Sequence, residues 1–194
     1  MLPGTPYSVL VVSSGAKINE FLSEVLEPAS YSPVIFAKSG GEARNILITQ
    51  SFDLIIINAP LSDEFGNDLA LKLTDNAVCG VILIVKSEIY EDVSDQVEQY
   101  GVLAVSKPMS RPVFMQVLKM SVATLERLRR LDKENKRLSL KLDEIKLIDR
   151  AKWVLIEYLK MSEPQAHRYI EKQAMDMRIT KREVAESIIK NYEN

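Results

Sequence analysis

Short hydrophobic runs alternate with longer amphipathic stretches along residues 1–118. Five of these runs are rich in Val and Ile, which is typical of strands buried in a parallel sheet: residues 8–12, 34–36, 53–57, 81–85 and 103–105. The stretches between them place apolar residues at intervals of three and four, as helices that cover a sheet do. The pattern predicts an α/β domain with a (βα)5 doubly wound sheet, whose functional edge lies at the C-terminal ends of the strands.

From Pro112 the pattern changes to one long helix, because neither Gly nor another Pro occurs before Pro164. Six of its positions, spaced alternately by three and four residues, form a seam: Leu128, Leu131, Asn135, Leu138, Leu142 and Ile145. Apolar residues in this spacing, with one buried Asn, favour a parallel coiled-coil homodimer. A monomeric amphipathic helix that packs back on the first domain is the alternative.

Two capping boxes predict two further helices. Ser162 stands three residues before Gln165, and Thr180 three before Glu183, so side chain and backbone can bond reciprocally at each helix start. With the end of the long helix they are expected to form a three-helix bundle, whose core is predicted to consist of Ala151, Val154, Leu155, Tyr158, Ala166, Tyr169, Ile170, Ala174, Val184, Ala185, Ile188 and Ile189. We therefore expect a sheet domain at residues 1–118, a coiled-coil linker at 119–140 and a helical domain at 141–194.

The formal net charge of −2 conceals two unlike halves. Residues 1–118 carry 7 Lys and Arg against 14 Asp and Glu, a net charge of −7. Residues 119–194 carry 18 against 13, a net charge of +5. A basic helical region has an electrostatic reason to bind a polyanion such as a nucleic acid.

The sequence shows no sign of membrane insertion, export or catalysis. Its longest aliphatic runs, residues 54–57 and 81–85, are far shorter than the roughly 20 residues that span a membrane. One cysteine cannot form an internal disulfide, and residues 1–7 lack the charged start of a signal peptide. We expect a cytoplasmic protein that is not an enzyme and binds no cofactor and no metal.

Two predicted strand ends have characteristic spacings to later residues. Lys107-Pro108 lies 22 residues after Val85, and Gly66 lies eight after Asn58. In these features residues 8–118 resemble the receiver domain of bacterial response regulators, which has a flavodoxin-like fold. In that family an acidic pair after the first strand binds Mg²⁺, and an Asp that ends the third accepts a phosphoryl group. A Thr or Ser ends the fourth strand, and a Lys followed by Pro ends the fifth.

Most of the residues that carry this chemistry are absent here. Ser13 and Ser14 replace the acidic pair, Asn58 replaces the phosphorylated Asp, and Val85 replaces the hydroxyl residue, so only Lys107 remains. Mg²⁺ prefers carboxylate oxygens, and an acyl phosphate needs a carboxylate nucleophile. We expect a pseudo-receiver with a degenerate pocket, regulated by a partner protein or a small ligand rather than by phosphorylation.

Four other side chains of chemical interest are assigned no role in a catalytic or metal site. Asp63 and Glu64, in the loop beyond the third strand, are expected to be solvated rather than to replace the lost metal ligands. Cys79 is expected to be a small buried apolar side chain, and His167, the only histidine, cannot build a metal site alone.

The last part of the chain carries several short motifs in order. Ala151-Lys152 is followed by Ser162-Glu163 at a helix start, by Ala174-Met175-Asp176 and by Val184-Ala185. In this order it resembles the ANTAR domain, a family of RNA-binding transcription antiterminators usually fused to receiver or sensor domains through a coiled coil. Trp153, where the family usually has Gly, and Ile156, where it often has Met, depart from the pattern.

The resemblance implies a dimer that binds two closely spaced stem-loops in leader RNA, so that an overlapping terminator cannot form. Hairpin loops expose unstacked bases and concentrate phosphates. The expected RNA contacts are Lys152, Arg178, Lys181, Arg182, Gln173 and Met175. Arg168 and Lys172, four residues apart, share one helix face. Lys152, Lys181 and Arg182 can instead be snorkelling or solvated cations. Trp153 is expected to pack in the core or between helices rather than to stack on a base, and Met175 and Met177 are expected to be packing residues first.

Two other classes of regulator are kept as alternatives. A conventional phosphorelay response regulator of a two-component system would still be phosphorylated in its receiver domain, against which the missing carboxylates argue. A DNA-binding regulator would also use a basic dimer, but the capped helices lack the glycine turn of a helix-turn-helix motif.

Overall fold

The computed structural model describes residues 5–76 and 78–192. The chain forms two compact units, and the boundary between them lies between Arg130 and Leu131. The first unit contains a five-stranded parallel sheet with the order β2-β1-β3-β4-β5. Its strands are β1 (Tyr7–Val12), β2 (Tyr31–Ala37), β3 (Leu54–Asn58), β4 (Gly80–Lys86) and β5 (Leu103–Lys107). All five predicted strands are confirmed, and the doubly wound order follows because the chain starts in the middle of the sheet and reverses direction once.

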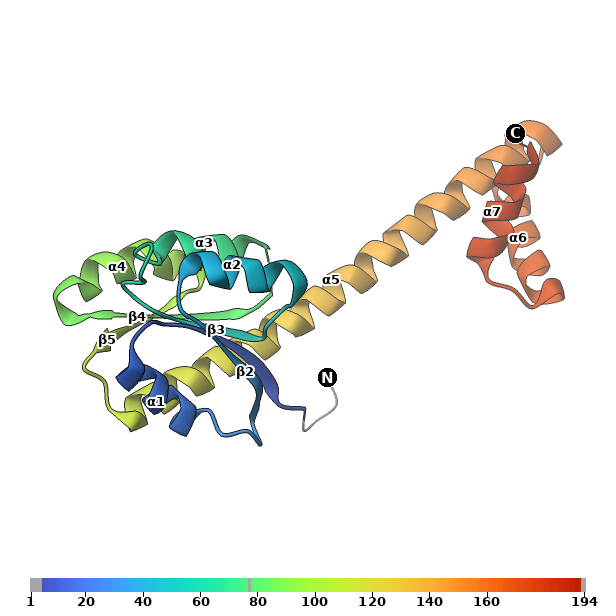
Figure 1. Cartoon of the computed structure of the whole chain (residues 1–194). Helices are drawn as coiled ribbons and strands as arrows, with labels where there is room; N and C mark the ends of the chain where they lie inside the picture. The colour runs from blue at the N-terminus through green and yellow to red at the C-terminus, as the bar shows by residue number, and fades with distance from the viewer. Residues whose placement is uncertain (1–4, 77, 193–194) are drawn as a thin grey trace. The chain divides into compact units, whose positions relative to one another are not determined.

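Helices cover both faces of this sheet (Figure 1). Helices α2 (Gly40–Thr49), α3 (Asn67–Asn76) and α4 (Tyr90–Val97) pack on one face, and α1 (Ala16–Val25) and the start of α5 (Arg111–Leu159) pack on the other. Two short 3-10 turns, η1 (Ser87–Ile89) and η2 (Glu98–Tyr100), flank α4. The central strands read as continuous apolar runs because neither of their faces meets water.

The first turns of α5 are part of the core of the first unit. Phe114, Leu118 and Leu125 are buried among the apolar side chains on one face of β1, β3 and β4. Helix and strand approach each other closely at Gly80, where a Cβ atom would overlap the side chains of Ser121 and Leu54. Glycine at this position therefore lets α5 pack directly on the start of β4.

The second unit is a three-helix bundle formed by the end of α5 with α6 (Glu163–Met177) and α7 (Lys181–Tyr192). Both predicted capping boxes are present: Ser162 N donates to Gln165 Oε1 at 2.8 Å, and Thr180 N donates to Glu183 Oε2 at 2.7 Å. The predicted core is confirmed except at two tyrosines. Tyr158 and Tyr169 are exposed, because Val154, Leu155, Ala166 and Ile170 occupy the inward positions of their helices. None of the helices in residues 5–76 and 78–192 is both long and apolar enough to cross a membrane.

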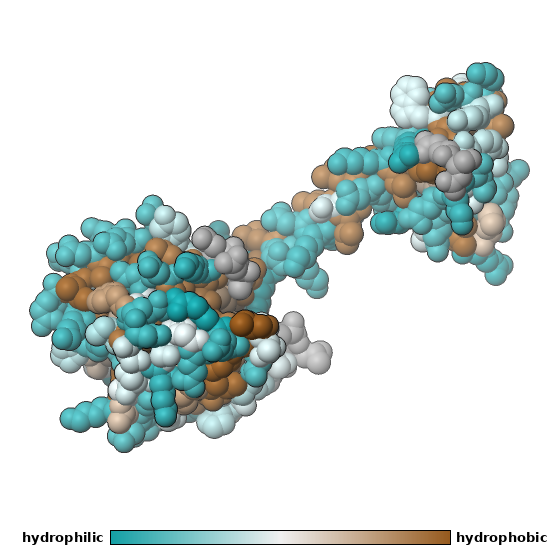
Figure 2. Space-filling model, turned by 45° about the horizontal axis from the view of Figure 1, so that its top comes forward, coloured by the Kyte–Doolittle hydropathy of each residue, from teal (hydrophilic) through white to brown (hydrophobic). Residues whose placement is uncertain are grey.

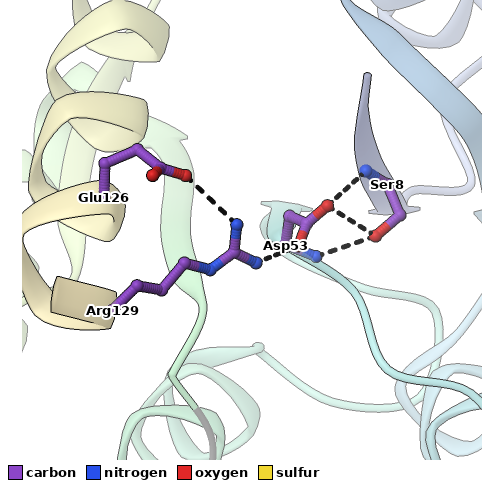
Figure 3. Close-up of polar contacts among 4 residues, drawn as sticks. All are labelled: Ser8, Asp53, Glu126 and Arg129. Carbon is purple, nitrogen blue, oxygen red and sulfur yellow. Dashed lines mark hydrogen bonds and ion pairs between the residues drawn. The ribbon is translucent and has the colours of Figure 1, made fainter. Parts of the chain in front are cut away.

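A polar contact also holds α5 to the sheet (Figure 3). Asp53, just before β3, is nearly buried and accepts hydrogen bonds from Ser8 N at 2.7 Å and Ser8 Oγ at 2.9 Å. Its other carboxylate oxygen pairs with the guanidinium group of Arg129 on α5, which also contacts Glu126 at 3.2 Å. A buried carboxylate needs such partners, because its desolvation is costly. The pair thus fixes the point where α5 leaves the first unit.

We expect Arg129→Met to destabilise the first unit by about 2 kcal/mol, because Asp53 would remain buried without its cation. The loss stays below that of a fully buried pair, since the Arg129 side chain is 29% exposed. Hydrogen exchange at β1 and β3 in the full chain would measure it.

Glu126→Gln is the matched control, because it removes only the exposed partner of Arg129 and is expected to change stability by less than about 1 kcal/mol. Equal protection of β1 and β3 in wild type and Arg129→Met would contradict the anchoring role of the pair.

Candidate functional site

The degenerate pocket at the C-terminal edge of the sheet is filled by a closed set of hydrogen bonds. Asn58, at the end of β3, donates from Nδ2 to Ser13 Oγ at 3.1 Å and accepts at Oδ1 from Lys107 Nζ at 2.8 Å. Lys107 Nζ also donates to the carbonyl oxygen of Ala59 at 2.7 Å. The amide of Asn58 therefore joins the ends of β1, β3 and β5, and uses its donor and its acceptor to do so.

The charge in this pocket does not suit a hard cation. Within residues 5–76 and 78–192 Lys107 forms no ion pair, and no three His, Cys, Asp or Glu residues are grouped to hold a metal. Burial, and then the nearby charge of Lys86, lower the pKa of Lys107. Mg²⁺, which the receiver fold implies, would meet a hydroxyl, an amide and an ammonium group instead of carboxylates. The residues present do not fit this ion.

The two remaining pocket positions contribute no ligand groups to this set of bonds. Val85 is fully buried in the core, and Ser14 is exposed to solvent. Ser87, the hydroxyl nearest to Val85 in sequence, donates to the backbone oxygen of Lys107 at 2.5 Å. Ser87 thus binds the backbone of β5 and does not replace the missing hydroxyl at the end of β4.

Asp63 and Glu64 have structural contacts that the sequence did not predict. Asp63 is exposed, as expected, but it also accepts hydrogen bonds from the backbone N–H groups of Gly40 and Gly41, both at 2.8 Å. These bonds lower the pKa of Asp63. Glu64 is only partly exposed and pairs with Arg44 at 2.7 Å, so the expectation that it is simply solvated is wrong. Both residues hold the loop after β3 to the start of α2.

In the second unit, three of the expected RNA-binding cations are already paired with carboxylates. Lys152 Nζ lies 2.8 Å from both Asp149 and Glu163, and these two hydrogen bonds raise its pKa. Lys181 pairs with Glu171 at 2.6 Å. Arg182 likewise pairs with Glu186, at 2.9 Å. An RNA phosphate would have to compete with these carboxylates.

The other expected RNA contacts lie near the end of α6. Arg178 caps this helix in the left-handed conformation, with φ of 54°, and is exposed. Gln173 is partly buried, whereas Met175 is 79% exposed. These three residues are therefore neighbours along one helix end and available to a partner.

The predicted packing of Trp153, Met175 and Met177 is wrong. Trp153 is 69% exposed, and both methionines are also largely exposed. The reason is helical geometry: Ala151, Val154 and Leu155 take the inward positions of α5, and Trp153 falls on another face. Cys79, in contrast, is buried as expected, and burial raises the pKa of its thiol to about 11.

The predicted coiled-coil seam is an exposed apolar stripe on α5. Its five apolar members, Leu128, Leu131, Leu138, Leu142 and Ile145, are 45–57% exposed, and Asn135 is also exposed. Figure 2 shows hydrophobic side chains in brown among hydrophilic ones along this helix. Apolar side chains repeated along one helix face are a surface that a second helix can cover.

Both units are similar to known proteins. A family model described as the ANTAR domain matches residues 136–189. The transcriptional regulatory protein PdtaR of Mycobacterium tuberculosis is 28% identical over 185 residues, which are 95% of this chain and 90% of that protein.

Solved structures match the first unit. The signal receiver domain of an HD domain-containing protein from Pseudomonas fluorescens is 20% identical, with a TM-score of 0.59 over 67% of this chain and 96% of its own. A CheY-like receiver domain from Methanospirillum hungatei is 19% identical, with a TM-score of 0.57 over 63% and 98%. These likenesses establish the fold of the first unit.

Acid is expected to weaken the second unit. Lys181 lowers the pKa of Glu171, and the Thr180 backbone lowers the pKa of Glu183, from an ordinary value of 4.5. Because both pKa values are lower in the folded state, the stabilisation is complete above about pH 4.5 and is lost as the pH falls through the folded values. Protection of α6 and α7 against hydrogen exchange, corrected for intrinsic rates, should decrease between pH 6 and pH 3.5. Glu183→Gln should flatten this dependence, and an unchanged dependence would contradict the assignment.

Proposed function

Because the chain is an ANTAR-domain response regulator with a receiver-like first domain, we propose that it regulates transcription antitermination by binding paired stem-loops in leader RNA. The observation that carries the proposal is the ANTAR match at residues 136–189, which covers the end of α5 together with α6 and α7. The match to a transcriptional regulatory protein over nearly the whole chain supports a regulatory role.

The RNA surface is assigned to the second unit. Arg178, Gln173 and Met175 are near the end of α6, where the ANTAR motif is matched, and Arg178 and Met175 are exposed. Lys152, Lys181 and Arg182 add positive charge, but each must exchange a carboxylate for a phosphate to contact RNA. Unpaired loop bases offer edges and flat faces that a duplex hides, which favours a hairpin as the target.

A homodimer formed through the seam on α5 would present two such surfaces. The seam residues are exposed in the single chain, and their spacing suits a parallel two-stranded coiled coil. Asn135 would specify the register, because pairing it with its counterpart avoids burying a lone amide. Two linked binding surfaces favour an RNA with two hairpins over an RNA with one.

The first domain is proposed to respond to a partner protein or small ligand, not to phosphorylation. A neutral amide at Asn58 cannot form an acyl phosphate, and the pocket holds a cation where Mg²⁺ would be needed. The alternative, a conventional phosphorelay response regulator, requires a different acceptor. The homology to transcriptional regulators fits a binding protein rather than an enzyme.

Incubation with acetyl phosphate and Mg²⁺ is expected to leave the intact mass of the protein unchanged. The reason is that no carboxylate lies among the hydrogen-bonded groups of the pocket to act as nucleophile. A bona fide receiver domain treated in parallel provides the positive control. A mass increase of one phosphoryl group in this protein would support the phosphorelay alternative.

Electrophoretic mobility shifts at fixed salt test the RNA assignment. RNAs that the protein retains are first selected from a pool with two short stems and randomised loops. The probes compared are these selected RNAs, single hairpins cut from them, and a DNA duplex. We expect the paired hairpins to bind at least about 10-fold more tightly than a single hairpin, because linkage raises the effective concentration of the second site.

Leu131→Glu combined with Leu138→Glu is designed to break the seam. This variant should be monomeric by light scattering and should lose the preference for two hairpins while its bundle stays folded, since both residues are exposed in the single chain. If the wild-type protein binds the DNA duplex more tightly than the paired-hairpin RNA, the DNA-binding alternative is favoured and the proposal is contradicted.

A further inference from the structure

An open hollow of about 550 Å³ lies in the second unit beside the turn from α5 to α6. Lys160 turns the chain here in the left-handed conformation, with φ of 53°. The far wall is one face of α6, because Gln165, Arg168, Tyr169 and Lys172 follow at intervals of three, one and three residues. This face is separate from the core face of α6, which carries Ala166, Ile170 and Ala174.

Three cations border this hollow, and none of them is neutralised. Lys160, Arg168 and Lys172 form no ion pair within the described ranges, residues 5–76 and 78–192. Among the described residues, none of those that line the hollow carries a carboxylate. The cations of the expected RNA surface differ in this respect, because Lys152 and Lys181 are held by acidic residues.

The second unit as a whole is close to neutral, so the excess of positive charge around this hollow is a local feature. Residues 131–194 carry 14 Lys and Arg against 12 Asp and Glu. Most of the net positive charge of residues 119–194 therefore comes from the first turns beyond residue 118, not from the bundle. Three unpaired cations around one hollow repel each other, and a bound anion would relieve this repulsion.

The same hollow is also lined by an aromatic side chain and by a hydrogen-bond donor. Tyr169 is 37% exposed, and the half-exposed Leu159 adjoins it in the lining. Gln165 uses Oε1 to cap α6, which leaves its amide nitrogen to donate. Cations, an aromatic face and a polar donor together match the phosphate, the base face and the base edge of a nucleotide.

We propose that this hollow binds one unpaired nucleotide of a hairpin loop. The base stacks on Tyr169, and the flanking phosphates contact Lys160, Arg168 and Lys172. This assignment rests on the proposed RNA-binding function and adds a contact site to it. An acidic peptide would pair with the cations but would not use the flat face of Tyr169, which is why a nucleotide is favoured.

Binding of the paired-hairpin RNA to full-length variants, measured by fluorescence anisotropy over a series of salt concentrations, tests the site. Tyr169→Ala should weaken binding about 5- to 100-fold without changing the salt dependence, because it removes stacking but no charge. Tyr169→Phe should bind within about 2-fold of wild type. Arg168→Gln with Lys172→Gln should reduce the slope of log affinity against log salt by about 1.4, since each contact with a single-stranded phosphate contributes about 0.7.

Lys181→Gln with Arg182→Gln is the matched control. It removes the same charge from positions that are ion-paired in the free protein, and it should change the slope less. Equal thermal unfolding of all variants by circular dichroism would establish that the bundle stays folded.

The outcomes separate this inference from the proposed function. If the wild-type protein binds no paired hairpins, the proposed function fails. If it binds them and Tyr169→Ala binds equally well, the function stands and the nucleotide site is refuted. If the Arg168→Gln, Lys172→Gln double variant binds more weakly than wild type and Tyr169→Ala does not, a stacked base is also refuted. Such a result shows only a general attraction of the cations to phosphate.

Discussion

The buried carboxylate of Asp53 is the constraint on which the course of the long helix depends. Its two hydrogen bonds to Ser8 hold the N-terminal ends of β1 and β3 together, and its pair with Arg129 brings α5 to the same point. Without a cation on α5 the carboxylate would be desolvated and unpaired, so helix and sheet stabilise each other. The first unit ends one residue later, at Arg130. The part of α5 that belongs to the first unit is therefore held to the sheet by an ion pair as well as by apolar contacts.

The anchor and the degenerate pocket are at opposite ends of one strand. Asp53 precedes β3, and Asn58 ends it. At one end an ion pair fixes α5, and at the other the amide of Asn58 accepts a hydrogen bond from Lys107. Asn58 also donates to Ser13 at this end, so its amide bonds to groups from strand ends on both sides of β3. This edge is thus held by hydrogen bonds that need neither a metal nor a phosphoryl group.

Charge in the second unit is organised by pairing rather than by total. Lys152, Lys181 and Arg182 are near the matched motifs, yet carboxylates of the same bundle neutralise them. The pair of Lys152 with Glu163 links α5 to α6 and that of Lys181 with Glu171 links α6 to α7, whereas the pair of Arg182 lies within α7. Within the part of the chain that the structure describes, the cations around the hollow beside the α5–α6 turn form no ion pair, so a nucleic acid can bind them without first displacing a carboxylate of the protein.

The sequence by itself determined the elements of both units, because they follow from local periodicity and local hydrogen bonds. Alternation of apolar runs located five strands, the stretch without Gly or Pro after Pro112 located the long helix, and Ser162 and Thr180 located two helix starts. Motif order was sufficient to identify the ANTAR domain, since the matched residues are close in sequence.

Tertiary structure alone decided which side chains are paired, buried or free. Asp53 and Arg129 are 76 residues apart, and nothing in their local sequence indicates that they meet. Trp153 and Met175 are exposed because other residues occupy the inward positions of their helices. Which positions face inward depends on how the three helices pack. Whether a lysine is neutralised depends on a carboxylate from another helix, as for Lys181 and Glu171. Such contacts are set by the packing of distant elements, and periodicity within one element carries no information about them.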